Sequence, residues 1–306
     1  MKQKFPIFAL LFALVIGVGC DRSEGEEPAE EQGAEEIGEG YVRSDDWPED
    51  PKRILSLAPN ITEILFELDL GDRVVAVSRY CDWPDEVDGL ARVGGVLDPD
   101  YEAILATEAD LVLGVTHDSD RALIEKLAAA EMAYGMLAIE DFSSIFAAIE
   151  QLGQWLGVDE RARQLTGEME AQLNAGAENI SAILDNQDFS VLLVFDREPV
   201  VAAGPRSFGG ELITRAGLRN ALDDELLGTY PVLDMEHILQ ANPDIVVDVT
   251  YGPNAAEEAR RYWWRFDAIE AVQKERVFHI DDPVMLRPGP RIPQAVERLG
   301  QALEEL

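Results

Sequence analysis

The chain has 306 residues, of which 47% are hydrophobic, and its 60 acidic against 25 basic residues give a formal net charge of −35. The length and the hydrophobic content are those of a globular protein with room for two domains. So negative a charge argues against binding nucleic acid or an anionic membrane through a general basic surface, and it indicates a solvated acidic surface.

The N-terminus has the pattern of a secretion signal over residues 1–19. Lys2 and Lys4 precede an apolar run over residues 5–19, which is shorter than the roughly 20 residues of a membrane span. Residues 17–20 resemble the processing site of bacterial lipoproteins, although Gly17 stands where such sites usually carry leucine. The resemblance implies that Cys20 is acylated and anchors the chain on the periplasmic or cell-surface side of a membrane. Without acylation, a soluble secreted protein is expected.

Residues 20–51 are predicted to form a disordered acidic tether between this anchor and the folded chain. Glu, Gly, Pro and Ala dominate the segment, and its few apolar residues cannot offset the entropy of ordering it. With Cys20 acylated, Cys81 is a lone thiol and no disulfide framework is expected.

Strands and helices alternate over residues 52–158, the predicted N-terminal lobe. Strands are expected at residues 54–58, 74–78, 111–115 and 134–137, and helices at 60–70, 101–106, 121–130 and 141–156. Asn60 and Glu63 have the spacing of a capping box at the start of the first helix. This alternation predicts a mostly parallel sheet covered by helices on both faces.

A long helix is predicted over residues 159–185. Its apolar residues recur three or four apart on one face: Ala162, Leu165, Met169, Leu173, Ala177, Ile180 and Leu184. At about 1.5 Å per residue the helix would be roughly 40 Å long, enough to hold two lobes at a fixed separation.

Residues 186–306 resume the pattern and form the predicted C-terminal lobe. Strands are expected at residues 191–195, 200–203, 245–249 and 277–280, and helices at 211–216, 234–241 and from 293. Residues 257–272 are expected to be largely helical. The predicted fold class is therefore α/β, with two lobes joined by a single long α-helix.

An internal repeat supports the two lobes. Residues 102–105 (EAIL) and 109–113 (ADLVL) recur as residues 236–239 (EHIL) and 243–247 (PDIVV), with the same offset of 134 in both cases (236 − 102 and 244 − 110). The offset is far longer than the roughly 20 to 50 residues of a solenoid repeat, which indicates duplicated lobes. Glu102 and Glu236 therefore begin equivalent helices. There they either only interact with the helix dipole or clamp a two-fold partner that carries arginines.

Ligands of open α/β sheets bind outside the carboxyl ends of the strands, so the loops at those ends are candidates for a cleft between the lobes. These loops carry aromatic rings, guanidinium groups and one histidine. The candidate ligand-binding residues are Tyr80, Trp83, His117, Arg197, Arg206, Phe208, Tyr230, Tyr251 and Arg287. The mixture is typical of a site for a large, partly aromatic ligand with polar edges. The alternative for any one aromatic residue is that it only packs its own loop.

Other chemistry has less support in the spacing of the residues. Cys81, His117 and a carboxylate such as Asp82 or Asp118 are the groups of a thiol hydrolase, but no spacing typical of one is present. His117 is also a possible ligand of a metal, such as the iron of a haem. The chain has no P-loop, no HExxH and no GxGxxG after its first strand.

The two remaining histidines are expected to be structural. His237 lies beside Glu236 in a predicted helix, and His279 lies within a predicted strand.

Six short segments carry a family resemblance when they are taken in order. They are RILSLAPNITE from Arg53, YCDWP from Tyr80, VGG from Val93, EAIL from Glu102, PDIV from Pro243 and RPGPR from Arg287. Together they resemble the helical-backbone (class III) periplasmic binding proteins, nearest the cobalamin-binding receptors of ABC importers, from about residue 52 to the C-terminus. The resemblance implies two Rossmann-like lobes with the ligand between them and little hinge motion. It also implies that glutamates matching Glu102 and Glu236 dock on arginines of a permease dimer.

Within the ligand site, the resemblance implies aromatic contacts at Tyr80 and Tyr230 and a polar contact at Arg287. The chain departs from the cobalamin receptors at Val96 and Val115, where those receptors carry aromatic residues. The expected function is a solute-binding lipoprotein of an ABC importer for cobalamin or a related corrinoid, with no catalytic residue, metal or cofactor of its own. Ferric-siderophore and haem receptors of the same fold are the alternatives, and a Cys/His hydrolase is the alternative from another class.

Overall fold

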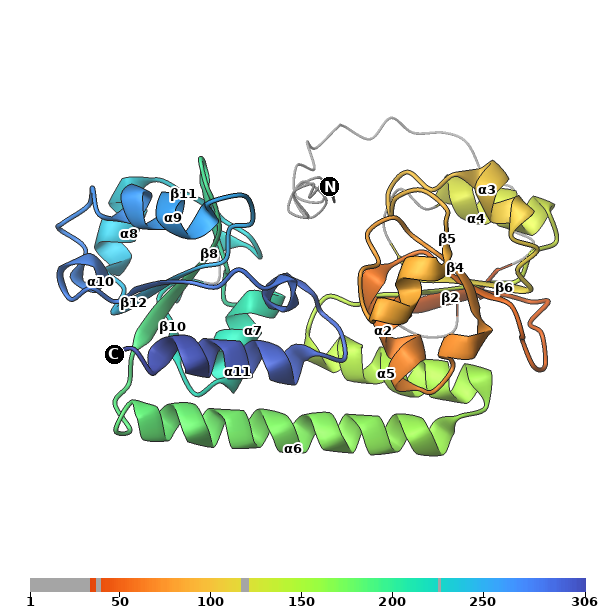
Figure 1. Cartoon of the computed structure of the whole chain (residues 1–306), viewed down its shortest axis with the longest axis horizontal. Helices are drawn as coiled ribbons and strands as arrows, with labels where there is room; N and C mark the ends of the chain where they lie inside the picture. The colour runs from red at the N-terminus through yellow and green to blue at the C-terminus, as the bar shows by residue number, and fades with distance from the viewer. Residues whose placement is uncertain (1–33, 37–39, 117–120, 225–226) are drawn as a thin grey trace, which may run out of the picture. The chain divides into compact units, whose positions relative to one another are not determined.

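The computed structural model describes residues 34–36, 40–116, 121–224 and 227–306, which form two compact units (Figure 1). The N-terminal unit contains the described residues up to 139 together with residues 143–166, and the C-terminal unit contains residues 140–142 and 167–306. The predicted signal peptide, Cys20 and the tether as far as residue 33 lie outside the described residues.

The N-terminal unit is built on a seven-stranded sheet with the strand order β1-β2-β7-β6-β3-β4-β5. Its parallel strands are β3 (Ile54–Ser56), β4 (Val74–Val77), β5 (Ala91–Arg92), β6 (Leu111–Val115) and β7 (Tyr134–Leu137). The helices are α2 (Pro59–Glu67), α3 (Tyr101–Ala106), α4 (Arg121–Ala129) and α5 (Phe142–Leu156). The mostly parallel sheet expected from the alternating pattern is confirmed.

Two antiparallel strands, β1 (Ala34–Glu36) and β2 (Tyr41–Ser44), extend this sheet beyond β7. The prediction of a disordered tether is therefore wrong for residues 34–36 and from Tyr41 onward. The Tyr41 ring lies edge-on to Trp155 at 5.6 Å, and Trp47 packs on the same ring at 5.0 Å while its Nε1 donates to the Trp155 carbonyl. Two aromatic side chains bury a segment whose average composition is that of a disordered chain.

The start of α2 also differs from its prediction. Pro59 occupies the first helical turn, the N-cap is Ala58 without a side-chain cap, and Asn60 lies inside the helix rather than before it. Proline fits this position because its fixed φ is already helical and its missing N–H has no partner to lose there.

The long helix α6 (Asp159–Ile183) runs for 25 residues and confirms the longest element predicted. Up to Thr166 it belongs to the N-terminal unit and from Gly167 to the C-terminal unit. Asp185 and Asn186, both with positive φ, end it. Within the described residues, no helix has the length and apolar character needed to cross a membrane.

The C-terminal unit contains a six-stranded sheet with the strand order β11-β9-β8-β12-β13, and β10 pairs with β8. The strands are β8 (Ser190–Arg197), β9 (Val200–Ala202), β10 (Arg219–Asn220), β11 (Val232–Leu233), β12 (Ile245–Asp248) and β13 (Val277–His279). β8, β10, β12 and β13 are parallel, whereas β9 folds back antiparallel on β8. The helices are α7 (Phe208–Arg215), α8 (Met235–Ala241), α9 (Ala255–Trp263), α10 (Glu270–Gln273) and α11 (Ile292–Leu303).

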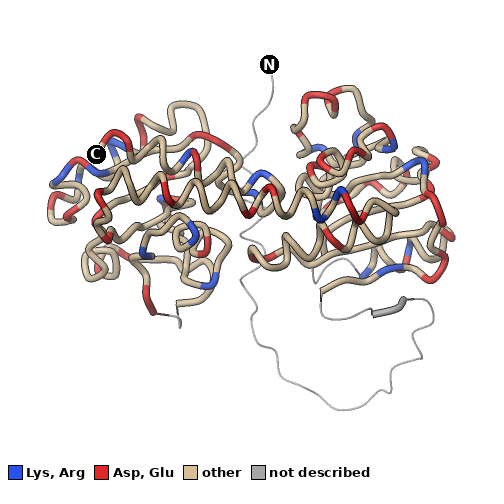
Figure 2. The backbone as a smooth tube through the Cα atoms, turned by 90° about the horizontal axis from the view of Figure 1, so that it is seen from below, with Lys and Arg blue, Asp and Glu red and all other residues tan. Residues whose placement is uncertain are grey.

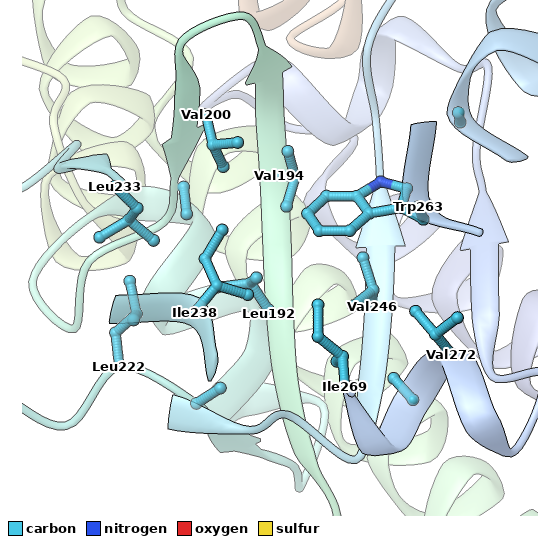
Figure 3. Close-up of a cluster of buried hydrophobic side chains, with 14 residues drawn as sticks. Leu192, Val194, Val200, Leu222, Leu233, Ile238, Val246, Trp263, Ile269 and Val272 are labelled. Atoms are coloured by element: carbon cyan, nitrogen blue, oxygen red, sulfur yellow. The ribbon is translucent and has the colours of Figure 1, made fainter. Parts of the chain in front are cut away.

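Residues 257–272, which were expected to be largely helical, form two helices, α9 and α10, with a break between them. Trp263 and Ile269 are both fully buried in one core cluster (Figure 3). Six residues along a continuous α-helix would place the two side chains about 120° apart, and the break lets both point into the same core.

The repeat is confirmed at the level of individual hydrogen bonds. Asp110 accepts from the backbone N–H of Arg53 at 3.0 Å, and Asp244 accepts from that of Ser190 at 2.9 Å. Each aspartate thus joins the strand that follows it to the start of a neighbouring strand. The residues two positions earlier, Glu108 and Asn242, both adopt positive φ.

Candidate functional site

Tyr80, in the loop after β4, is held by an arginine. The Arg79 guanidinium lies over the Tyr80 ring at 5.1 Å and makes two 2.7 Å bonds to the carboxylate of Asp98. A Cβ on Gly95 would lie 2.1 Å from that carboxylate, so only glycine leaves room for the pair as it stands. The loop therefore presents a partly exposed tyrosine in a fixed setting.

Cys81 has the environment of a structural cysteine. It is only 2% exposed, and its Sγ lies 3.1 Å from the Thr62 hydroxyl and 3.2 Å from that of Ser78. Arg92 fastens the same loop by donating to the Cys81 and Ser78 carbonyls. A nucleophilic thiol needs an accessible thiolate, so this burial gives the hydrolase hypothesis no support. His117 lies outside the described residues.

Trp83 is 41% exposed in the same loop as Tyr80. The two valines at which the chain departs from the cobalamin receptors, Val96 and Val115, are partly buried, and Val115 is the last residue of β6.

In the C-terminal unit, Tyr230 lies against the sheet. Its ring packs edge-on to Phe195 of β8 at 5.5 Å, and burial, together with the charge of Glu140, raises the pKa of its phenol to about 12. The backbone beside it is close-packed: Gly204 donates to the Thr229 carbonyl, and a Cβ on Gly204 would lie 2.0 Å from the Gly228 carbonyl oxygen. Tyr230 is thus a neutral, half-buried ring on a rigid support.

Arg197, at the end of β8, is engaged within its own unit. Its guanidinium donates to the Ala255 carbonyl at 3.1 Å and lies 3.7 Å from Asp248 and 3.4 Å from Glu258. Asp248 is fully buried and also accepts from Trp263 Nε1 at 2.8 Å. This carboxylate, which the sequence analysis missed, is marked in the sequence only as an acid that ends an otherwise apolar strand. The contacts give Arg197 a bracing role between β8 and α9.

A polar cavity of about 510 Å³ opens beside Arg197. It is lined by Asp196, Arg197, Glu198, Glu258, Arg261, Tyr262 and Arg265. The Arg265 guanidinium lies over the Tyr262 ring at 4.5 Å, and burial raises the pKa of that tyrosine. The sequence analysis did not single out Arg261, Tyr262 or Arg265, although two arginines four residues apart around an aromatic run are a recognisable signal. Matched numbers of arginines and carboxylates leave the cavity without a strong preference for one sign of charge.

The four other candidate residues of this unit differ in exposure. Phe208 is 2% exposed and stacks on Phe142 at 5.7 Å, so it packs the core. Arg287 is 6% exposed, Tyr251 is partly exposed and Arg206 is exposed. A direct ligand contact at these positions stays a prediction, and Phe208 is the least accessible to one.

The histidines that the structure describes have local partners, as predicted. His237 Nδ1 lies 2.8 Å from Asp234, and His279 Nε2 lies 2.9 Å from the Thr250 carbonyl. Among the described residues, no group of three or more His, Cys, Asp and Glu side chains is placed to hold a metal ion.

Glu102 and Glu236 are both exposed, each in the first turn of its helix. Both helices are capped by an aspartate, Asp100 in α3 and Asp234 in α8. Hydrogen bonds from the backbone and the ring of His237 lower the pKa of Asp234. Acidic residues, red in Figure 2, are scattered along both units, so the two glutamates are distinguished by their equivalence rather than by local charge alone.

Comparisons with known proteins agree with this architecture. The family model described as periplasmic binding protein matches residues 54–284. An uncharacterized ABC transporter substrate-binding lipoprotein of Bacillus subtilis, YvrC, is 30% identical, with 99% of this chain and 98% of the relative covered. A vitamin B12-binding protein of Vibrio campbellii is 25% identical, with 83% of this chain and 90% of the relative covered.

Solved structures show the same fold. The periplasmic haem-binding protein RhuT of Roseiflexus has a TM-score of 0.72 at 25% identity, covering 83% of this chain and 98% of its own. The vitamin B12-binding protein BtuF of Vibrio cholerae has a TM-score of 0.68 at 24% identity, covering 84% and 98%.

The chain belongs to the periplasmic binding protein family and has its class III fold, two α/β units with one long helix between them in the chain. It is an ABC transporter substrate-binding protein. The members of this family are periplasmic or extracellular binding proteins that deliver a ligand to a permease rather than enzymes.

Proposed function

We propose that this chain captures cobalamin or a related corrinoid in a site to which both units contribute, and that it needs no cofactor of its own. The relatives described as vitamin B12-binding, which match over 83–84% of the chain, support this ligand class. A large planar macrocycle with polar edges is recognised by flat aromatic surface and a few directed hydrogen bonds.

The observation that carries the proposal is a pair of tyrosines, one in each unit. Tyr80 is held by the Arg79–Asp98 pair, and Tyr230 is held against Phe195. These are the positions at which the resemblance implies aromatic contacts with a corrinoid. Both rings have a packing partner within their own unit, which favours pre-organisation and so reduces the entropy lost on binding.

Haem is the second candidate, because several neighbours in structure are described as haem-binding. RhuT and the haem-binding BhuT have TM-scores of 0.72 and 0.70. If haem is the ligand, His117 is the proposed iron ligand, since imidazole nitrogen suits iron. Ferric siderophores form the third class.

Delivery is proposed to use Glu102 and Glu236, each docking on a basic side chain of one half of a permease dimer. The chain is proposed to reach that permease from a lipid anchor at Cys20. Replacing both glutamates by alanine is expected to leave ligand affinity unchanged and to abolish uptake. Normal uptake by that double variant would refute the docking role.

Titration of the purified apo-protein with cyanocobalamin, haem and a ferric siderophore tests the ligand class. Heat and visible absorbance are followed together, so that a haem–histidine bond is seen by its spectrum. Saturable one-to-one binding of cyanocobalamin, with weaker binding of the other two, is expected. A haem spectrum that changes in His117→Ala, without binding of cyanocobalamin, would replace the corrinoid by haem.

A further inference from the structure

The helices α3 and α8 expose the same apolar residue. Six large hydrophobic side chains are prominently exposed in the described part of the chain: Trp83, Leu105, Val232, Leu239, Trp264 and Leu306. Leu105 and Leu239 are equivalent under the 134-residue offset, and both are 42% exposed. Each lies three residues after a glutamate, Glu102 or Glu236, and therefore on the same side of its helix as that glutamate.

The two helices are fixed in the same register. Asp100 accepts from the Ala103 N–H at 3.1 Å, and Asp234 accepts from the His237 N–H at 2.9 Å. Ile104 and Ile238, the residues just before the leucines, are fully buried, and Ile238 lies in the core beside Leu192 (Figure 3). Because each isoleucine pins its helix to the sheet, neither leucine can turn inward.

The other positions of the two helices have diverged. Among the exposed residues, Ala106 corresponds to Gln240, and Glu108, just after the first helix, corresponds to Asn242. Tyr101 and Met235, which are partly buried, also differ. A single exposed leucine is ordinary on a protein surface, but matched leucines beside matched glutamates are not explained by the packing of either unit.

We propose that Leu105 and Leu239 are apolar anchors of the permease-docking surface. Each unit presents a Glu-x-x-Leu pair, and each half of the permease dimer receives it with a basic side chain next to a shallow apolar pocket. The inference rests on the proposed docking role of Glu102 and Glu236 and adds the part of the contact that excludes water. Apolar contact beside an ion pair strengthens the pair, because it removes water from around the charges.

The negative charge of the chain indicates which kind of partner binds this surface. A second copy of the chain would bring glutamate against glutamate at a net charge of −35, which disfavours self-association through these helices. A partner that repeats its own basic site satisfies both pairs at once, and a dimeric permease is such a partner. Anionic lipid is disfavoured for the same reason as a second copy.

The test measures uptake of radiolabelled cyanocobalamin by cells that lack this chain and are complemented with its variants. Leu105→Ser/Leu239→Ser is expected to reduce uptake at limiting ligand by tenfold or more, since losing one buried leucine contact costs about one decade of affinity. Leu105→Met/Leu239→Met is expected to restore uptake. Leu306→Ser, which removes a leucine that is 47% exposed outside both helices, is the matched control and is expected to have no effect. Calorimetry on each purified variant is expected to show unchanged cyanocobalamin affinity and thermal stability.

The outcomes separate the inference from the function on which it rests. Normal uptake by the serine double variant, when Glu102→Ala/Glu236→Ala abolishes uptake, would overturn the leucine anchors and leave the glutamates in place. Normal uptake by both double variants would overturn docking through these helices altogether. Failure of the wild-type chain to support uptake would overturn the corrinoid proposal alone. The same variants are then compared in uptake of haem, where normal uptake by the serine double variant would overturn the leucine anchors.

Discussion

Asp248 shows how one buried carboxylate organises the end of the C-terminal sheet. It accepts from the Trp263 ring and from the hydroxyl of Thr250 at 2.6 Å, and it faces Arg197. A buried charge is stable only when it is paired and fully hydrogen-bonded. The carboxylate thus connects β12, α9 and the end of β8, and it holds one wall of the polar cavity.

Asp248→Asn is expected to destabilise the C-terminal unit by about 2–4 kcal/mol, because an amide has only one oxygen to accept these bonds and leaves Arg197 without its buried counter-charge. Glu258→Gln is the matched control: it removes the other carboxylate near Arg197, but one that is half exposed, and is expected to cost under about 1 kcal/mol. Chemical denaturation of both variants gives the comparison. Equal costs would show that Asp248 does not have the role described.

Tyr230 has a consequence for stability at high pH. The pKa of its phenol is raised from 10.0 to about 12, so the folded state favours the neutral ring. The corresponding stability is fully present below pH 10 and is lost as the pH rises from 10 towards 12. A tyrosinate absorbance titration of the native protein is expected to show an ionisation near pH 12 that comes from the Tyr230 phenol. This ionisation is expected to be missing in Tyr230→Phe. An unchanged titration curve in that variant would contradict the assignment.

At the scale of elements, α6 meets α11 at a position where only glycine fits without a shift of its neighbour. A Cβ on Gly176 would lie 2.7 Å from Cγ1 of Val296 in α11, whereas a Cβ on Gly167 would meet nothing within 4 Å. The β-branched Val296 has little freedom to move aside. The helix therefore combines one exposed, unconstrained glycine with one that sets the close approach of α11.

Gly167→Ala and Gly176→Ala are expected to have opposite effects on thermal stability. The first removes backbone entropy from the unfolded chain and should stabilise by about 0.5–1 kcal/mol. The second makes the same change in helix propensity but overpacks the contact with Val296, and it should destabilise by about 1–3 kcal/mol. Shifts of the same sign, measured by thermal unfolding, would contradict the packing described for α6.

Helices and strands with a clear apolar periodicity were predictable from the sequence. Those that depend on contacts with residues far away in the chain were not. The bounds of α3, β6 and β7 agree with their predictions because each is a short periodic run between clear stop signals. β2 was missed because its order comes from β7 and from Trp155, which lie more than ninety residues further along the chain. The break before α10 was missed because it is set by the need to bury both Trp263 and Ile269.

The same distinction between predictable and unpredictable features applies to the candidate site. The sequence located the loop of Tyr80 correctly, since strand ends can be read from the pattern of apolar runs. Arg197 was expected in a loop, but it is the last residue of β8. The sequence could not distinguish aromatic side chains that are exposed on a loop from those that are buried in the core. Phe208 is one of the buried ones. Side-chain direction depends on the neighbours that a helix or strand meets in space, as the stack of Phe208 on Phe142 shows.

At the scale of the whole molecule, duplication explains both the fold and the proposed mechanism. In the proposed mechanism, each of the two equivalent units offers one aromatic contact to the ligand and one Glu-x-x-Leu pair to the permease. If the ligand contacts both tyrosines, as proposed, each unit contributes to its affinity.

The central claim is tested most directly by calorimetric titration of cyanocobalamin into the apo-protein and into Tyr80→Ala and Tyr230→Ala, with Trp264→Ala as an exposed aromatic control. One-to-one binding is expected for the wild type and for the control. Binding about tenfold weaker is expected for each tyrosine variant, because each loses one ring contact of roughly 1.4 kcal/mol. Binding that depends on only one of the two tyrosines, or on neither, would contradict a ligand site to which both units contribute.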